Sequence, residues 1–468
     1  MEDMDMTKTS ATLAEYASGI SCDALPLEVR QRAKQLVLDI TGIALRARHD
    51  AESTPSLIAA VERLGLAGGN ASVIGDETSY APSAAALING SLAHSLDFDD
   101  THAAASLHTS APIVPAALAA AEMTGADGAT TLAAIVAGFE VQIRIALALG
   151  PLGHYERGFH PTATCGSFGA AAAAARVFGL PPTQIASAFG ICASQAAGCM
   201  LFLADGAWTK RSQVGAAAQT GLVAATLAGE GFFGTAEPFD GPRGFLRTYA
   251  PNPNPARATA GLGDEHETLN IAVKPYPSCR YSHGGIDGVR SLRAAHDIAA
   301  TDVVSIDISL SPAGHDIIGT PEARKQHPIN AVDGQFSMPF LAAVALRDGA
   351  MTWESYAKHL ADAETLALCR RAFCHAEAGL EGMQAHVAIR TNHGSFEAVV
   401  ETPKGEPERF LTEPEMWAKF DGLVAAYLSP TRREALATAL LSLEDQSDIA
   451  GVLALTRSDW PAALEAAS

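Results

Sequence analysis

A succession of alanine-rich helical segments in the first half of the chain constrains the fold more than any other sequence feature. Each segment has apolar residues at helical spacing or a run of strong helix formers. Proline, serine or threonine begins many of them and glycine ends them, as in Leu180 to Thr183 and Val177 to Gly179. Because alanine runs such as 170–175 let backbones approach closely, we expect an all-helical domain with a core of small side chains. The expected helices are 11–18, 26–45, 55–64, 82–93, 112–123, 130–149, 167–178, 183–198 and 215–228.

The pattern changes near residue 270, where strand signals begin. Residues 303–310 alternate between apolar and polar side chains, as a half-buried strand does. The face expected to be buried holds Val304, Ile306, Ile308 and Leu310. Residues 385–391 and 395–401 flank Asn392-His393-Gly394, which predicts a hairpin. The helices expected in this part are 285–296, 336–346 and 352–360.

Helical patterns return after about residue 414, and the expected helices there are 416–428, 430–441 and 448–453. This return indicates that the part with strands is inserted into the helical domain. We therefore predict a mainly α fold with an α+β part. Residues 1–269 and 409–468 form the all-helical domain in this prediction, and residues 270–408 form a smaller α+β domain.

Charge and cysteine content exclude several classes of protein. The 468 residues include 52 acidic and 32 basic ones, and the net charge of -20 argues against binding of nucleic acid or of an anionic membrane. An anionic substrate would need a local basic pocket. The seven cysteines form no CxxC pair, which suits free thiols in a reducing cytoplasm and argues against a zinc site. The chain starts with a polar, acidic stretch unlike a signal or transit peptide, so we expect a cytoplasmic protein.

The segment 91–115 holds three carboxylates and three histidines among apolar residues. Aspartates disfavour helix interiors and repel one another, so such clustering is typical either of a functional site or of a helix terminus. Asp97 and Thr101 are four residues apart and would share one face of a helix. A functional role is the better interpretation for Asp97 and His108.

Several polar residues have a structural interpretation at least as good as a functional one. Asp99 or Asp100 fits an N-cap, and His102 fits a solvated face. His160 lies in a turn before the alanine helix, where a lone histidine is more often structural. The same turn presents the backbone N–H groups of 162–166 at a helix N-terminus, which is a ready site for an anion.

Basic side chains occur at two places that suit a carboxylate. Lys210 and Arg211 follow a stretch with almost no other positive charge, although a solvated helix end explains them slightly better. Further on, two prolines stiffen a loop that presents Lys274, Arg280 and His283. Cations on a rigid loop at a domain junction suit carboxylate binding, and ion pairs that tie the domains together are the alternative.

Motifs spread over nearly the whole chain resemble the MmgE/PrpD family and occur in the order of that family. They are HSLDFDDTH at 94–102, HTSAPIVPAALA at 108–119, GFHPTATCGSFGAAAAA at 158–174, KPYPSCRYSHGGID at 274–287 and AVDGQFSMPF at 331–340. That family includes 2-methylcitrate dehydratase, cis-aconitate decarboxylase and iminodisuccinate epimerase. The resemblance implies a helical domain formed by both chain ends, an inserted α+β lid and a homodimer. The site residues it implies are Asp97, Thr101, His108, His160, Lys210 and Lys274.

The reactions of that family take place at a carbon beside a carboxylate. Negative charge develops on the carboxylate oxygens, so cations must lie nearby before a base of ordinary strength can act. A base and an acid on opposite faces are also required. The residues expected to bind the substrate are Thr101, Lys210, Lys274, Arg280 and His283, and the base and acid are expected among Asp97, His108 and His160.

A hydro-lyase that acts on a small hydroxy-polycarboxylate such as 2-methylcitrate is the first expectation. An epimerase of an imino-dicarboxylate and a cis-aconitate decarboxylase are alternatives, because the same residues serve all three reactions. Cys279 and Phe340 depart from the pattern of the decarboxylase and of many family members, respectively, and count against decarboxylation. A non-enzymatic helical dimer, with its charged segments in inter-domain ion pairs, is the last alternative. The sequence carries no metal, nicotinamide or phosphate-loop signature, so we expect no cofactor.

Overall fold

The computed structural model describes residues 9–459, so most of the polar N-terminal stretch lies outside the described residues. The chain divides into two compact units. One unit combines Met1–Ala272 with Glu413–Ser468, and the other is Val273–Thr412. The domain boundaries expected after residues 269 and 408 stay a prediction.

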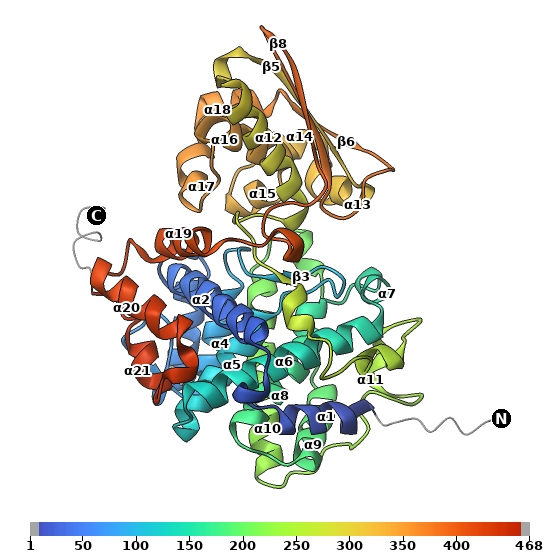
Figure 1. The fold of residues 1–468 in the computed structure, drawn as a ribbon, viewed down its shortest axis with the longest axis vertical. Coiled ribbons are helices and arrows are strands. Elements are labelled where there is room, and N and C mark those ends of the chain that lie inside the picture. The colour runs from blue at the N-terminus through green and yellow to red at the C-terminus, as the bar shows by residue number, and fades with distance from the viewer. Residues whose placement is uncertain (1–8, 460–468) are drawn as a thin grey trace, which may run out of the picture. The chain divides into compact units, whose positions relative to one another are not determined.

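The centre of the helical unit is a group of closely packed helices (Figure 1). It consists of α4 (Pro82–Ala93), α5 (Ser110–Thr124), α6 (Gly128–Leu149), α8 (Pro161–Val177) and α10 (Thr209–Gly229). α8 packs against α5, α6 and α10, and α10 packs in turn against α4. Where α6 crosses α8, a Cβ atom at Gly138 would lie 2.9 Å from the carbonyl oxygen of Gly169, so glycine is required there. The expected close approach of backbones is therefore confirmed.

The other helices of this unit are α1 (Thr9–Gly19), α2 (Leu27–Asp50), α3 (Thr54–Arg63), α7 (Pro151–Glu156), α9 (Pro182–Ala193) and α11 (Phe245–Tyr249). Every helix expected in the first half of the chain is present, and the short helices α7 and α11 are additional. Among the described helices, α6 alone is long and apolar enough to cross a membrane by length and composition. Its most apolar stretch is 100% buried inside the structure, as in a core helix.

The expectation that this unit is all-helical is wrong in two places. β1 (Ala67–Ser72) pairs with β2 (Ser79–Tyr80), and β3 (Thr101–His102) pairs with β4 (Ile271–Ala272), both antiparallel. The sequence of β1, AGGNAS, lacks the β-branched residues that signal a strand. Gly69 permits the pairing, because a Cβ atom there would lie 2.2 Å from the carbonyl oxygen of Tyr80. Close backbone approach, rather than a side-chain pattern, allows this ribbon.

The second unit contains a mixed sheet with the strand order β6-β5-β7-β8. Its strands are β5 (Val303–Leu310), β6 (Ala372–Ala376), β7 (Ala385–Thr391) and β8 (Gly394–Val400). β6 runs parallel to β5, and the other pairs are antiparallel. Asn392 and His393 form the loop between β7 and β8, so the expected hairpin is confirmed. α12 (His283–His296) and α16 (Met338–Asp348) pack against this sheet.

The strand β5 departs from its expected pattern at one residue. Val304 is 40% exposed, whereas Val303 is buried. The pairing of β5 with β7 shifts between Val303 and Ser305, and this irregularity turns Val304 out of the buried face. The remaining helices of this unit are α13 (Pro312–Gly314), α14 (Glu322–Lys325), α15 (Ala331–Gln335), α17 (Glu354–His359) and α18 (Ala363–Cys369).

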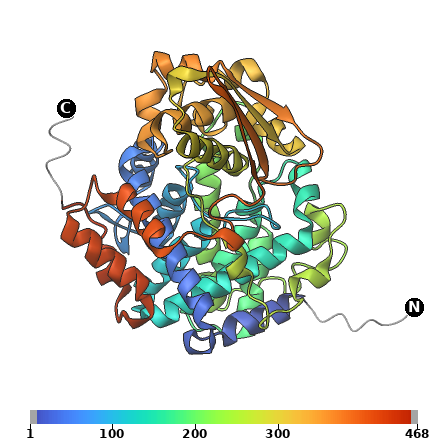
Figure 2. The same cartoon turned by 45° about the horizontal axis from the view of Figure 1, so that its top comes forward.

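The C-terminal helices belong to the helical unit, and Figure 2 shows them beside α2. α19 (Glu413–Val424) and α20 (Pro430–Leu441) pack against α2, and α21 (Ile449–Ala454) packs against α5. Lys419 on α19 is buried, and its Nζ lies 2.6 Å from Asp39 Oδ1. The same ammonium donates to the carbonyl oxygen of Phe98 at 3.1 Å and lies 4.1 Å from the centre of its ring. The end of the chain thereby anchors the acidic segment that follows α4.

We expect Lys419→Met to lower the free energy of unfolding by about 3–5 kcal/mol, because it leaves the buried Asp39 without its partner. Lys358→Met is the control: Lys358 also pairs with an aspartate, but its side chain is 62% exposed. Its loss is expected to cost less than about 1 kcal/mol. Urea denaturation of the two variants measures the difference, and equal costs would contradict the anchoring role of Lys419.

Candidate active site

The acidic segment after α4 is not helical. α4 ends at Ala93, and Asp97 takes a left-handed backbone conformation with φ 52°. Thr101 then begins β3, and its Oγ1 is buried with no hydrogen-bond partner within residues 9–459. The expectation that Asp97 and Thr101 share one helix face is therefore wrong. Adjacent aspartates disfavour a helix, and an aspartate tolerates a positive φ better than most residues do.

Asp100 and His102 shape the loop between α4 and α5. Asp100 Oδ1 accepts hydrogen bonds from the backbone N–H groups of Thr109 (2.9 Å) and Ser110 (3.0 Å), and its Oδ2 accepts one from the Ser110 hydroxyl. Asp100 thus satisfies N–H groups at the start of α5 from nine residues away, whereas the N-cap of α5 is Thr109, so the expected N-cap at Asp99 or Asp100 is wrong. His102 is buried, so the expected solvated position is wrong, and its Nε2 lies 3.1 Å from Glu267 Oε2.

Asp99 is fully buried between two histidines. Its Oδ2 lies 2.7 Å from His94 Nδ1 and 3.0 Å from His108 Nδ1. We call these three residues the Asp99 cluster. A carboxylate can only accept hydrogen bonds, so His94 donates from Nδ1 and keeps a lone pair on Nε2 when it is neutral. His108 Nδ1 lies within ion-pair distance of the same oxygen but makes no hydrogen bond among the described residues. Burial raises the pKa of Asp99, but His108 and His94 outweigh burial and hold that pKa well below its usual range.

His94 is a member of this cluster that the sequence pattern does not single out. Its ring centre lies 4.6 Å from that of His108. Burial lowers the pKa of His94 to about 4, against the opposing effect of Asp99. Its Nε2 is buried and has no hydrogen-bond partner in the described part of the chain. Such an atom is rare and unfavourable in a protein interior, and it indicates a role beyond packing. Its place in the HSLDFDDTH motif is the one signal the sequence offers.

Helices α6 and α8 position the other two histidines. The backbone N–H of His108 donates to Thr162 Oγ1 at 3.1 Å, and the carbonyl oxygen of His108 accepts from Gln142 Nε2 at 3.0 Å. His160 caps the start of α8, and its ring centre lies 5.7 Å from that of His94. Burial first, and then His94, lowers the pKa of His160 well below its ordinary value. The structure therefore brings His108 and His160 together.

Lys210 lies in the first turn of α10. It forms an ion pair with Asp97, and its side chain is only 17% exposed, which does not fit the solvated helix end. Arg211 instead donates to the Ser53 hydroxyl at 2.8 Å. Asp97 thus contacts the lysine, whereas the sequence placed it among the candidates for the base and the acid. The catalytic role expected for Asp97 stays a prediction.

The other expected cations belong to the second unit. Lys274 is 1% exposed. Arg280 Nε donates to Glu406 Oε1 at 2.9 Å, and His283 Nε2 lies 3.3 Å from the carbonyl oxygen of Ser278. Arg280 and His283 therefore have partners inside their own unit. Contact of these three residues with a substrate stays a prediction.

The two departures from the family motifs lie in the core of the second unit. Phe340 is fully buried, and its ring stacks on that of Tyr356 with centres 6.1 Å apart. Cys279 is also buried. Because Phe340 fills a packed core, its identity reflects packing and carries little weight against decarboxylation.

The Asp99 cluster is also the group of residues that best fits a metal ion. Its ligand atoms lie within 4.8 Å of one another, and no other group of three or more histidine, cysteine, aspartate or glutamate residues in 9–459 does so. His94 Nδ1 donates to Asp99, so a metal ion would have to replace that hydrogen bond. The expected absence of a metal and of a cofactor stays a prediction.

The low pKa of His94 predicts a loss of stability in acid. A histidine with a folded-state pKa of about 4 and an unfolded value near 6.5 stabilises the fold above pH 6.5, and this contribution is lost as the pH falls towards 4. The loss amounts to about 3 kcal/mol. We expect the free energy of unfolding of His94→Gln to fall less steeply between these pH values, as measured by urea denaturation. His393→Gln, whose ring is 74% exposed, is the control, and identical slopes for His94→Gln and wild type would contradict the assignment.

Comparison with known proteins agrees with the motifs. A model of the MmgE/PrpD N-terminal domain matches residues 11–258, and a model of the MmgE/PrpD C-terminal domain matches residues 276–445. The chain is 32% identical over 476 residues to the cis-aconitate decarboxylase-like protein oryM of Aspergillus oryzae, which covers 95% of this chain and 96% of that protein. It is 30% identical to the cis-aconitate decarboxylase of Aspergillus terreus over 95% of both chains, and 27% identical to the human enzyme of that name over 75% of this chain and 73% of that one. The chain therefore belongs to the MmgE/PrpD family.

Proposed function

We propose that this protein is a carboxy-lyase that removes carbon dioxide from cis-aconitate or a closely related tricarboxylate. The observation that carries the proposal is similarity over 95% of the chain to proteins named cis-aconitate decarboxylase or cis-aconitate decarboxylase-like. The names of these relatives favour decarboxylation over the hydro-lyase reaction that the motifs suggest first. A tricarboxylate also suits the cations that the motifs place in the site.

Decarboxylation leaves an electron pair on carbon, and the site must stabilise it. When the carbon–carbon bond breaks, carbon dioxide leaves, and the pair spreads over the adjoining double bond and carboxylate. A cation beside that carboxylate stabilises the charge best where water is excluded. The largely buried ammonium of Lys210 is such a cation, held by Asp97. We assign it to a substrate carboxylate, and Lys274 is the second cation that the family resemblance implies.

A proton must then reach the carbon that carries the electron pair. His108 is the more accessible histidine of the Asp99 cluster, with 14% of its side chain exposed against 0% for His94. We assign the proton transfer to His108, whose imidazolium form gives its Nε2 proton to carbon and returns to neutral imidazole. The buried carboxylate of Asp99 orients the ring and stabilises its charged form. His94 shares the same carboxylate oxygen and fixes its position.

A purely structural role for these residues fits less well. A buried carboxylate that contacts two histidines, one with an unpartnered Nε2 atom among the described residues, is unfavourable unless it serves a reaction. A scaffold would gain stability from apolar residues at these positions. The same groups can also move a proton beside a carboxylate without loss of carbon dioxide, so dehydration and epimerisation are outcomes to test.

Proton NMR of the purified protein with cis-aconitate, 2-methylcitrate, citrate and iminodisuccinate in deuterated buffer tests the reaction. We expect the signals of cis-aconitate to give way to those of itaconate, together with release of carbon dioxide. New vinylic signals from 2-methylcitrate would instead identify a hydro-lyase, and deuterium exchange without a change of skeleton would identify an epimerase. Either of these outcomes, or no reaction, would contradict the proposal.

The same assay tests the site with a matched pair of lysine variants. We expect Lys210→Met to lower kcat/KM by about 100-fold or more, because it removes the charge beside the substrate carboxylate. Lys34→Met is the control, since Lys34 pairs with Glu444 at 2.6 Å and is 12% exposed. It should retain the activity of the wild type. Equal activity of the two variants would show that Lys210 does not bind the substrate carboxylate.

A further inference from the structure

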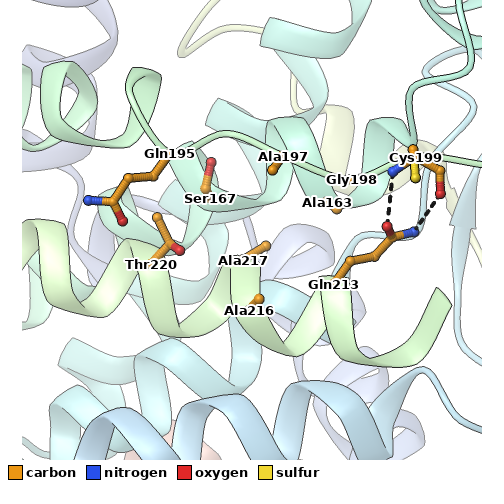
Figure 3. A pocket seen from close by; sticks show the side chains of 10 residues that line it. All are labelled: Ala163, Ser167, Gln195, Ala197, Gly198, Cys199, Gln213, Ala216, Ala217 and Thr220. Atoms are coloured by element: carbon orange, nitrogen blue, oxygen red, sulfur yellow. Dashed lines mark hydrogen bonds between the residues drawn. The ribbon is translucent and has the colours of Figure 1, made fainter. Parts of the chain in front are cut away.

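Gln213 on α10 is held by the backbone of one residue, as Figure 3 shows. Its Oε1 accepts from the N–H of Cys199 at 3.0 Å, and its Nε2 donates to the carbonyl oxygen of Cys199 at 3.2 Å. In the reverse orientation, the Gln213 NH2 group would face the N–H of Cys199, and the Gln213 oxygen would face the carbonyl oxygen of Cys199. The orientation of the Gln213 amide is therefore fixed by its surroundings.

This orientation determines where the neutral ring of His160 carries its proton. Gln213 Nε2 lies 2.7 Å from His160 Nδ1. Since an amide nitrogen can only donate, Nδ1 accepts, and the ring proton is on Nε2. In the Asp99 cluster the opposite holds for His94, which donates from Nδ1 to Asp99 Oδ2. The site thus contains His160 with an Nε2–H group and His94 with an Nε2 lone pair.

The surroundings also keep His160 neutral. His160 is 4% exposed. Four titratable groups affect its charge: His94 after α4, Asp99 and His108 in the loop before α5, and Lys210 on α10. Three of these four are basic side chains, and only Asp99 favours a positive charge on the ring. A neutral imidazole with an Nε2–H group is a hydrogen-bond donor that binds an anion without first taking up a proton.

We propose that Gln213 is a positioning residue that holds His160 as its Nε2–H tautomer, so that His160 donates a hydrogen bond to a carboxylate oxygen of the substrate. This proposal deepens the proposed function and rests on it for the identity of the substrate. The hydrogen bond strengthens as negative charge develops on that oxygen, as donors in an oxyanion site do. His160 keeps its proton throughout, and His108 carries out the proton transfer.

Gln213→Glu tests the proposal, because a carboxylate can only accept and must draw the ring proton of His160 to Nδ1. At high pH the Nε2 lone pair then faces the substrate oxygen, and we expect kcat/KM to fall about 100-fold. At low pH the ring gains a second proton and Nε2–H returns. Activity of the variant should therefore fall as the pH rises, with a new titration that the wild type lacks.

Gln195→Glu is the matched control. Gln195 lines the same cavity of about 260 Å³ as Gln213 but lies at its other end and is exposed, so it receives the same change of charge away from Cys199 (Figure 3). Gln213 is the residue that accepts from the N–H of Cys199 and donates to Cys199 and His160. We expect the pH profile of Gln195→Glu to match that of the wild type.

The tautomer itself is measured on the resting protein, independently of turnover. Two-bond proton–nitrogen NMR of histidine-labelled protein, assigned with His160→Gln, should show a pyridine-type Nδ1 and a pyrrole-type Nε2 for His160. Gln213→Glu should reverse them at high pH, and Gln195→Glu should not. A pyrrole-type Nδ1 in the wild type, or equal pH profiles for Gln213→Glu and Gln195→Glu, would overturn the proposal. If the wild type fails to decarboxylate any substrate, the proposed function fails, while the spectrum still decides whether Gln213 sets the tautomer.

Discussion

The buried carboxylate of Asp99 is the interaction on which the rest of the candidate site depends. One of its oxygens contacts His94 at 2.7 Å and His108 at 3.0 Å, and a fully buried carboxylate keeps its charge only with partners of this kind. Its charge fixes the tautomer of His94, which donates from Nδ1, and lies beside the Nδ1 atom of His108. The opposite tautomer of His160 then gives the site an Nε2–H donor beside the Nε2 lone pair of His94.

Much of the helical unit holds the loop between α4 and α5 in place. Asp100 satisfies backbone N–H groups at the start of α5 and so fixes the residues after the cluster. Lys419, from the last part of the chain, holds the carbonyl oxygen of Phe98 and pairs with Asp39 on α2. Glycines at the crossing of α6 with α8 let these helices come close enough to place Gln142 and Thr162 at His108. The C-terminal part of the chain, which returns to the first unit, therefore helps to hold the site residues in place.

The sequence predicts the helices and the hairpin well, because their signals are local. The spacing of apolar residues, the starting prolines and the turn at Asn392 depend on a few neighbouring residues. The strand β6 and the ribbon of β1 with β2 carry no alternation, since backbone pairing alone creates them. The bulge that exposes Val304 likewise depends on the partner strand.

Only some members of the candidate site, and none of its pairing, could be predicted from the sequence. Motifs identify His108, His160 and Lys210, whereas His94 and Asp99 gain their importance only from contacts made after the loop folds. Asp97 seemed suited to a helix face with Thr101, but the loop turns at Asp97 and brings it to Lys210 across 113 positions of sequence. Gln213 carries no motif, because its role depends on the backbone of Cys199.

The measurement that tests this account most directly is the turnover of cis-aconitate by Asp99→Asn. Asparagine keeps the shape of aspartate but carries no charge, so it cannot stabilise the charged form of His108 that gives a proton to the substrate. We predict that kcat falls by about 1,000-fold or more while the circular dichroism spectrum is unchanged, as when an orienting carboxylate is lost elsewhere. A variant with kcat within about tenfold of the wild type would contradict the central role of Asp99.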